Sequence, residues 1–94
     1  MKVGKHTAFL IDFVSRFADG DISRDDFVLD YSGYVIEHFP AMERENALLA
    51  RKFANTVDAQ YEYAENHNIS DDDFRIIMNN ALCDLLGTPK SDLL

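Results

Sequence analysis

The spacing of the apolar residues constrains this chain more than any other feature of its sequence. In the segment HTAFLIDFVSRF they recur three and four positions apart, at Phe9, Leu10, Phe13, Val14 and Phe17. Residues at this spacing lie on one face of an α-helix, so the segment predicts an amphipathic helix. No segment alternates apolar and polar residues with a period of two, and we therefore expect no strands. The pattern predicts an all-α fold.

Start and stop signals divide the chain into four predicted helices. The first begins near His6 with Thr7 as its N-cap, and Gly20 lies beyond its end. The others span about 24–38, 42–65 and 71–86. Phe39-Pro40 ends the second helix, because proline disfavours helical backbone in the residue before it. Short links between four amphipathic helices predict a single antiparallel four-helix bundle, one domain over residues 1–94, with the final TPKSDLL as a frayed tail.

The second, third and fourth predicted helices each carry one apolar stripe that we expect to face the core. The stripe of the second helix is Phe27, Val28, Tyr31 and Val35. That of the third is Leu49, Phe53, Val57, Tyr61 and Ala64. The fourth contributes Phe74, Ile77, Met78, Ala81, Leu82 and Leu85, with Gly87 past its end.

A short motif occurs twice, as ISRDDF from Ile22 and as ISDDDF from Ile69. Its serine suits an N-cap that accepts a hydrogen bond from the backbone N–H three residues on. The aspartates lie in the first turn, where the helix dipole favours negative charge. The isoleucine before the cap and the phenylalanine four residues after it have the spacing of a hydrophobic staple. Each residue thus has a structural role, and the motif predicts a helix start.

Calcium, transition-metal and catalytic sites are all poorly matched by the sequence. DGDISRDDF resembles half of an EF-hand loop, but the early ligand positions fall on Ser15 and Phe17, and phenylalanine cannot coordinate calcium. His6, His38 and His67 are far apart, and we expect each to be a surface residue without a metal. No phosphate loop or nucleophile elbow is present, and Cys83 is a lone, partly exposed thiol without an assigned base. We expect neither an enzyme nor a cofactor.

The composition of the chain indicates which kinds of partner it can bind and where it is expected to act. With 17 acidic and 9 basic residues, the net charge is −8, which repels nucleic acid and anionic membranes and attracts basic surfaces. Apolar runs are too short for a transmembrane helix, and the charged start does not read as a signal peptide. A single cysteine, Cys83, excludes an internal disulfide and suits a reducing cytoplasm. We expect a cytoplasmic protein with a basic protein partner.

The acidic residues gather in stripes. On the second predicted helix Asp26, Asp30 and Glu37 share one face with Gly33, opposite the apolar stripe, and on the third Asp58, Glu62 and Glu65 form a similar stripe. Such runs are commonly solvated helix faces. Because few basic residues accompany them, we favour a binding surface for a basic partner, with tyrosines 34, 61 and 63 as candidate anchors. The predicted contact residues are Asp19, Asp21, Asp25, Asp26, Asp30, Tyr34, Glu37, Asp58, Glu62 and Glu65.

The first 40 residues resemble a known group of proteins. The helix AFLIDFVSRF, the link ADGDIS and the helix start RDDFVLDY are similar to small immunity proteins of the colicin D type and to immunity proteins of contact-dependent growth-inhibition systems. The resemblance implies an all-helical acidic protein that binds the nuclease domain of a bacterial toxin and covers its basic active site. On this basis Asp21, Asp25, Asp26 and Asp30 are the candidate contacts.

Two other classes remain open at this point. An acidic regulatory or adaptor protein would use the same face on another basic protein. A self-associating helical protein would instead pack aromatic residues across a dimer. The sequence does not distinguish the oligomeric states.

Overall fold

The computed structural model describes residues 4–87, and within that range the chain is helical without a strand. The elements are α1 (Lys5–Ala18), α2 (Arg24–Glu45), α3 (Ala47–Phe53), the π-helical η1 (Ala54–Asp58), α4 (Ala59–Asn66) and α5 (Asp71–Leu86). Since α3, η1 and α4 follow one another with helical backbone at each junction, they form one long helix. The prediction of an all-α chain with four helices is confirmed.

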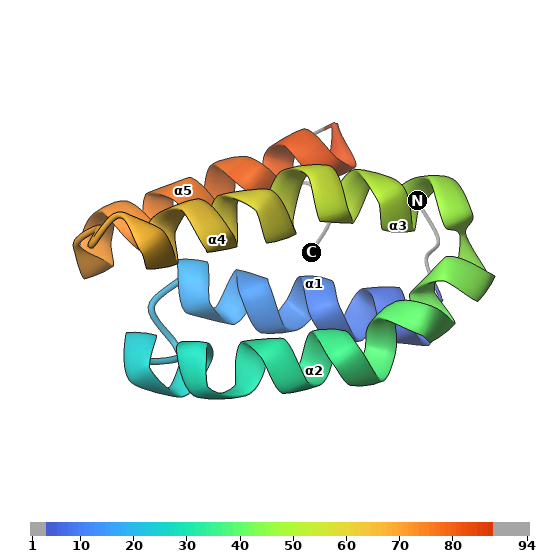
Figure 1. The fold of residues 1–94 in the computed structure, drawn as a ribbon, viewed down its shortest axis with the longest axis horizontal. Coiled ribbons are helices and arrows are strands. Elements are labelled where there is room, and N and C mark those ends of the chain that lie inside the picture. The colour runs from blue at the N-terminus through green and yellow to red at the C-terminus, as the bar shows by residue number, and fades with distance from the viewer. Residues whose placement is uncertain (1–3, 88–94) are drawn as a thin grey trace.

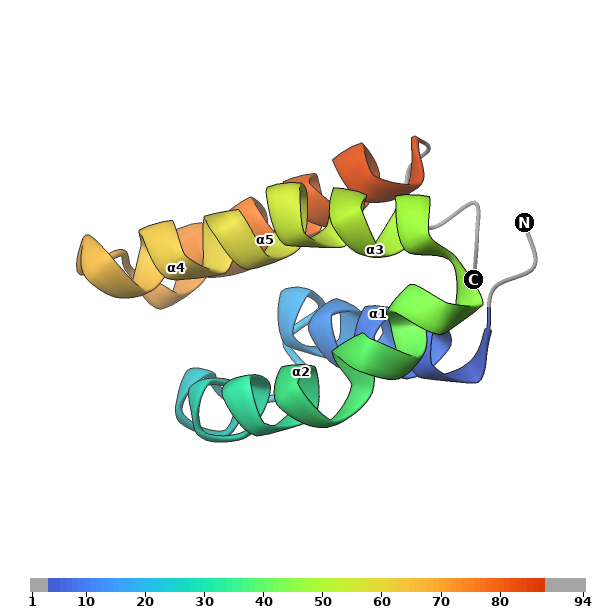
Figure 2. The same ribbon diagram turned by 45° about the vertical axis from the view of Figure 1, so that its right-hand side comes forward.

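The helices lie in two neighbouring pairs. α1 lies beside α2, and the long helix lies beside α5 (Figures 1 and 2). α1 also contacts α5, which joins the two pairs. At the centre of these contacts the Phe17 ring stacks on Phe27 at 4.1 Å between centroids and meets Phe74 edge-on at 5.0 Å. Aromatic residues from three helices thus close the core.

The predicted apolar stripes form this core. Phe27 and Tyr31 are buried and Val28 and Val35 half-buried, and all five residues of the third predicted stripe are buried. In the predicted stripe of α5, Ile77 is half-buried and the other five residues are buried. Phe9 departs from the prediction, because 39% of its surface remains exposed. Its ring lies at the edge of the core, stacked on His38.

The predicted end of the second helix is wrong. α2 continues through Pro40 to Glu45. A proline ring has helical φ and removes one backbone donor, so the helix tolerates it when packing compensates. Here Ala41 and Met42, just after the proline, are buried, and this burial favours continuing the helix. The break lies at Asn46, whose extended backbone (φ −163°, ψ 100°) separates α2 from α3.

The start of the first helix also differs from the prediction. α1 begins at Lys5, and Gly4 precedes it without a side-chain cap. Thr7 is buried inside the first turn, where its hydroxyl donates to Glu45 Oε1 at 2.8 Å. The same carboxylate accepts from the backbone N–H groups of His6 and Thr7, both at 3.0 Å. A residue from the far end of α2 therefore caps α1, and a local sequence pattern cannot reveal it.

Both copies of the repeated motif cap a helix as predicted. Ser23 Oγ accepts from Asp26 N, and Ser70 Oγ accepts from Asp73 N, each at 3.2 Å. The staple isoleucines, Ile22 and Ile69, pack against the core. The interpretation of the motif as a helix start is confirmed.

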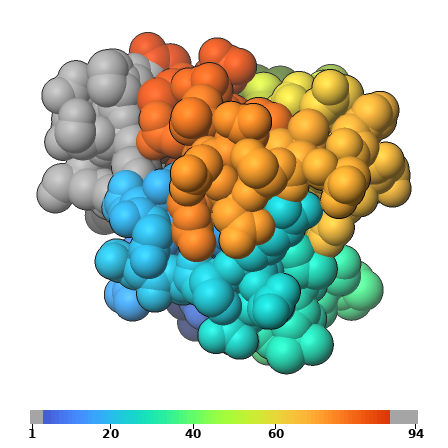
Figure 3. Space-filling view, turned by 90° about the vertical axis from the view of Figure 1, so that its left-hand side faces the viewer, coloured from blue at the N-terminus to red at the C-terminus, as the bar shows by residue number. Residues whose placement is uncertain are grey.

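The structure also brings the two motifs together. Arg24 of the first motif donates to the carbonyl of Ile69 and, at 3.0 Å, to Asp71 Oδ1. Arg75, which follows the second motif, donates to the carbonyl of Ile22 at 3.1 Å and to that of Phe17. Figure 3 shows this end of the molecule, where the α1–α2 link in cyan meets the start of α5 in orange. Each motif thus accepts a hydrogen bond from an arginine at the start of the other helix.

Candidate functional site

An open groove lies between α2 and the segment formed by η1 and α4. One lobe, of about 170 Å³, is lined by Val35, Phe39, Phe53, Ala54 and Asp58. The adjoining lobe, of about 200 Å³, is lined by Tyr31, Ser32, Val35, Ile36, Asp58, Tyr61 and Glu62. Val35 and Asp58 border both lobes, so the two lie side by side, and we refer to them together as the groove. Its first lobe is apolar apart from Asp58, its second carries two carboxylates, and none of these lining residues is basic.

A pair of tyrosines and one aspartate form the inner wall of the groove. The rings of Tyr31 and Tyr61 stack at 3.7 Å between centroids, and the Tyr31 hydroxyl donates to Asp58 Oδ1 at 2.9 Å. Burial and the neighbouring Asp58 carboxylate raise the pKa of Tyr31 far above its ordinary value. Burial and the charge of Glu65 raise the pKa of Tyr61 to about 12. Both tyrosines are therefore neutral at physiological pH, and the Tyr31 hydroxyl orients the Asp58 carboxylate.

Two large apolar side chains stand exposed beside the groove. Leu29 and Ile36 of α2 are 77% and 76% exposed, and they lie seven positions apart, on the same side of the helix. We call this pair the apolar ridge. A lone exposed apolar residue needs no explanation, but two in register next to a groove form a patch suited to contact another molecule. Sequence reasoning missed the ridge, although its signal was present: two apolar residues at helical spacing, outside the inward stripe.

The predicted acids of α2 lie on the other side of the ridge. Asp26, Asp30 and Glu37 fall within about 40° of one another around the helix, and all three are exposed. We call these three the outer stripe. The order around α2 is therefore outer stripe, apolar ridge and groove. The structure does not bring the outer stripe together with Asp58 and Glu62, since the ridge separates the two sets.

The remaining predicted contacts are distributed over the molecule. Glu62 is exposed at the groove, and Glu65 is half-buried near Tyr61. Asp19, Asp21 and Asp25 are exposed in or next to the α1–α2 link, at the end of the molecule shown in Figure 3. These three lie near the acidic first turn of α5 through the contact between the motifs. Asp19 and Asp21 extend the negative charge beyond α2, and Asp25 lies in its first turn.

The candidate tyrosine anchors differ in accessibility. Tyr61 is only 8% exposed, so little of its ring is accessible, and what is accessible faces the groove. Tyr34 is half-buried and packs edge-on against Phe9 and Phe13 of α1. Tyr63 is 48% exposed and stacks on His67. Leu29 and Ile36 are more exposed than any of the three tyrosines, and each is followed in the chain by an acid of the outer stripe.

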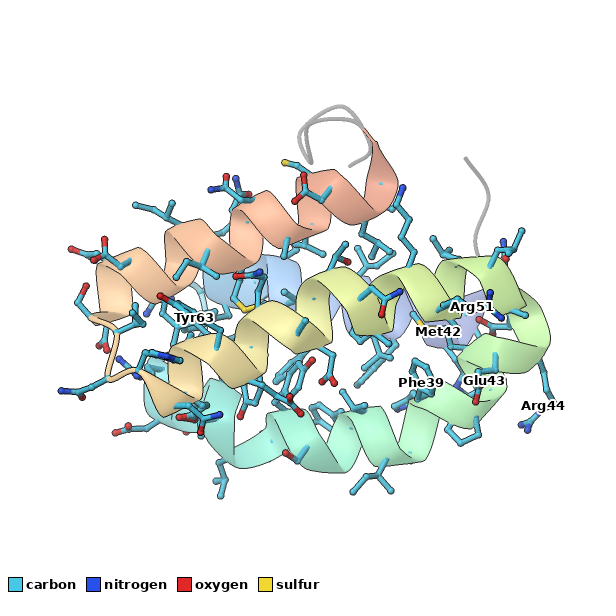
Figure 4. The ribbon with its side chains drawn as sticks, turned by 45° about the horizontal axis from the view of Figure 1, so that its top comes forward. Phe39, Met42, Glu43, Arg44, Arg51 and Tyr63 are labelled. Carbon is cyan, nitrogen blue, oxygen red and sulfur yellow. The ribbon has the colours of Figure 1, made fainter. Side chains whose placement is uncertain are left out.

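The segments that line the groove carry no lysine or arginine. The sequence has no lysine or arginine over residues 25–43 or 53–74, the segments that supply the groove, the ridge and the outer stripe. Arg24 and Arg75 are engaged at the contact between the motifs. Figure 4 shows Arg44 and Arg51 near the corner between α2 and α3, whereas Tyr63 lies toward the other end of the long helix. Within residues 4–87 the carboxylates around the ridge thus have no lysine or arginine as ion-pair partner, and the imidazole of His38 lies 4.0 Å from the Glu37 carboxylate.

One pair of histidines was not anticipated. His6 Nδ1 and His38 Nδ1 are 2.8 Å apart, and the His38 ring stacks on Phe9 at 4.2 Å. The His38 side chain is only 15% exposed, so the expectation of a surface residue is wrong there. The cause is the helix pairing, which places the start of α1 against the second half of α2. His67 is exposed near the end of α4, and its Nδ1 lies 2.7 Å from the Tyr63 carbonyl.

Among residues 4–87 no group of three or more histidine, cysteine or carboxylate side chains is arranged to hold a metal ion. No helix in the same range has the length and apolar character needed to cross a bilayer. Comparison with known proteins gave no matching family model, no similar curated protein and no similar solved structure.

Proposed function

We propose that this protein binds a basic protein partner through the apolar ridge and the carboxylates on both sides of it. The observation that carries the proposal is the position of Leu29 and Ile36, exposed between the outer stripe and the acids of the groove. An apolar centre with a polar rim is the usual anatomy of a protein interface. The absence of lysine and arginine from residues 25–43 and 53–74 favours a positively charged partner.

The partner proposed is the nuclease domain of a bacterial toxin, and the protein is its cytoplasmic immunity protein. A nuclease presents basic side chains to the phosphates of its substrate, so an acidic surface complements the same site and excludes nucleic acid. Opposite charge also accelerates association, which matters when a single free toxin molecule is harmful. The resemblance of the first 40 residues to immunity proteins is consistent with this partner. In this proposal the four helices form an antiparallel bundle that acts as a rigid support.

Self-association through the same surface is less favourable. Two copies facing each other across a two-fold axis would place the same outer stripe on both sides of the interface. Each copy carries a net charge of −8, so the contact would bring like charges together. An acidic adaptor for another basic protein would use the same chemistry, and the identity of the partner distinguishes the two functions.

The proposal is tested by co-expression with the product of the neighbouring upstream gene. We expect co-purification of a basic nuclease, loss of its RNA or DNA cleavage in the complex, and dissociation at high salt. Asp26→Lys and Asp30→Lys should each weaken binding while the helical content stays unchanged. Asp84→Lys, the same charge change at an exposed position of α5, serves as the control and should bind normally.

Two results would contradict it. Intact affinity in both α2 variants would exclude the outer stripe as a main contact. A neighbouring product without nuclease activity that still binds would reject the toxin and favour the adaptor function.

A further inference from the structure

The polarity of the lining residues changes along the groove, and this restricts what kind of group can bind there. Its lobe beside Phe39, Phe53 and Ala54 is apolar, and its lobe beside Ser32 and Glu62 is also mainly apolar but adds a hydroxyl and a second carboxylate. Asp58 borders both lobes, so a carboxylate stands where the apolar part ends. An occupant that fits both lobes has an apolar body and a cationic end.

We infer that the groove receives a single arginine side chain from the basic partner. This inference rests on the proposed function and specifies how the partner is recognised. The aliphatic stem of the arginine would lie against Val35, Phe39 and Phe53, and the guanidinium would lie between Asp58 and Glu62. Burying the stem on apolar surface while the charged end meets carboxylates is the normal behaviour of this side chain.

Asp58 is prepared to accept such a group. The Tyr31 hydroxyl already donates to its Oδ1, which holds the carboxylate in one orientation. A carboxylate has several lone pairs on two oxygens, so it still has capacity for further donors. Because Tyr31 and Tyr61 are held together at 3.7 Å, the wall around the carboxylate is rigid, and little freedom is lost on binding.

The geometry favours arginine over lysine. A guanidinium presents several N–H donors in one plane and reaches two carboxylates at once, whereas an ammonium is a compact and strongly hydrated charge. It is also more weakly hydrated, so entering a groove with apolar walls is less unfavourable. A lysine of the partner would instead pair with a carboxylate of the exposed outer stripe, where its ammonium group stays hydrated.

The test uses the intact protein and three forms of one helical probe peptide. The peptide carries lysines along one face and a single central arginine, and its counterparts have citrulline or lysine at the central position. Citrulline has nearly the shape of arginine without its charge. Binding is followed by the backbone amide signals in two-dimensional NMR spectra.

We expect signals of the groove, at Val35, Asp58 and Glu62, to shift only with the arginine peptide. Signals of the outer stripe, at Asp26 and Asp30, should shift with all three peptides. Because hydrogen bonds to a charged group are stronger than those between neutral groups, the arginine peptide should bind about tenfold or more tightly than the citrulline peptide.

Variants locate the effect within the groove. Asp58→Asn keeps an acceptor for Tyr31 but removes the charge, and it should abolish the preference for arginine. Ala54→Leu fills the apolar lobe without changing any charge and should have the same effect, which keeps the test valid if Asp58→Asn unfolds. Asp30→Asn on the outer stripe is the matched control and should preserve the preference.

The outcomes separate the two proposals. Shifts of the outer stripe that are equal for all three peptides, with an unaffected groove, would overturn the arginine inference and leave the acidic surface standing. The absence of shifts with every peptide would reject both. A preference for arginine that persists in Asp58→Asn and Ala54→Leu would place the arginine elsewhere and overturn the inference.

Discussion

Ser23 and Ser70 illustrate how single residues decide where helices begin in this protein. Each hydroxyl accepts from the backbone N–H three residues on, at 3.2 Å. Replacing either serine by alanine leaves that N–H without its partner, and we expect a loss of about 1 kcal/mol in the free energy of unfolding. Denaturant unfolding followed by circular dichroism measures the change.

The control for these caps is Asn80→Ala, which changes an exposed position inside α5. Alanine has a higher helix propensity than asparagine, so this variant should be unchanged or slightly more stable. Unfolding midpoints of Ser23→Ala and Ser70→Ala that equal that of the unaltered protein would refute the capping role of the motif.

The stacked tyrosines predict a specific response to alkali. Burial raises the pKa of Tyr31, and it raises that of Tyr61 to about 12, whereas both ionise near 10 in an unfolded chain. Above pH 10 the unfolded state loses these protons and the folded state keeps them. The stability that the pair contributes is complete below that pH and decreases as the pH rises above it.

Thermal unfolding at a series of alkaline pH values, with tyrosinate absorbance recorded in parallel, tests this response. The two tyrosines should ionise together with the loss of helical structure. In the double variant Tyr31→Phe, Tyr61→Phe, the fall in stability above pH 10 should be shallower. Normal ionisation of all tyrosines while the protein stays folded would contradict the buried arrangement.

At the scale of single residues, the sequence predicted what depends on neighbours in the chain. The serine caps and Gly20, with φ of 90° after α1, are of this kind, since a few adjacent residues determine them. Thr7 and His38 were predicted wrongly because their partners are 38 and 32 positions away. No local pattern encodes such pairs.

At the scale of elements, the Glu45 carboxylate joins the end of α2 to the start of α1 by hydrogen bonds. Hydrogen bonds from the backbone N–H of His6, and from the hydroxyl and backbone N–H of Thr7, lower the pKa of Glu45 below its ordinary 4.5. A lowered pKa means that the stabilisation is present at neutral pH and is lost as the pH falls through the folded-state pKa. A Cβ on Gly4 would collide with this carboxylate, so a larger residue there would displace Glu45 from these hydrogen bonds.

We therefore expect Glu45→Gln to lower the melting temperature at neutral pH. The difference from the unaltered protein should shrink under acidic conditions, because the glutamate is then protonated as well. Glu43→Gln, two residues earlier at an exposed position, is the matched control and should melt normally. An equal effect of both variants would show that net charge, and not the cap, determines the result.

Helix existence was easier to predict than helix ends. The periodic stripes located all four helices, but Pro40 suggested a boundary that the structure does not have. The burial of Met42 favours continuing α2 there, and burial depends on the whole fold. The π-helical turn at η1 was also not predicted, because apolar spacing does not distinguish one wider turn from a regular one.

At the scale of the whole molecule, the sequence located the acidic helices but not the surface that they form. A helical projection places Asp26, Asp30 and Glu37 together from sequence alone. It does not show which neighbour packs against each side of α2, so it could not reveal that the groove and the outer stripe lie on opposite sides of Leu29 and Ile36. That arrangement arises only when the long helix packs beside α2.

The same charge distribution predicts opposite effects of salt on the free protein and on its complex. In the free protein, carboxylates on α2, α4 and the helix links repel one another, since the net charge is −8. Raising the ionic strength from about 0.01 M to 0.15 M shortens the Debye length from about 30 Å to 8 Å and screens this repulsion. We expect the unfolding midpoint to rise, while the affinity for a basic partner falls over the same range of ionic strength.

A neutralised variant with Asp26→Asn, Asp30→Asn and Glu62→Gln should show a weaker salt dependence in both measurements. A midpoint that is independent of salt would mean that these carboxylates are compensated within the folded protein, and the electrostatic basis for choosing a basic partner would then fail.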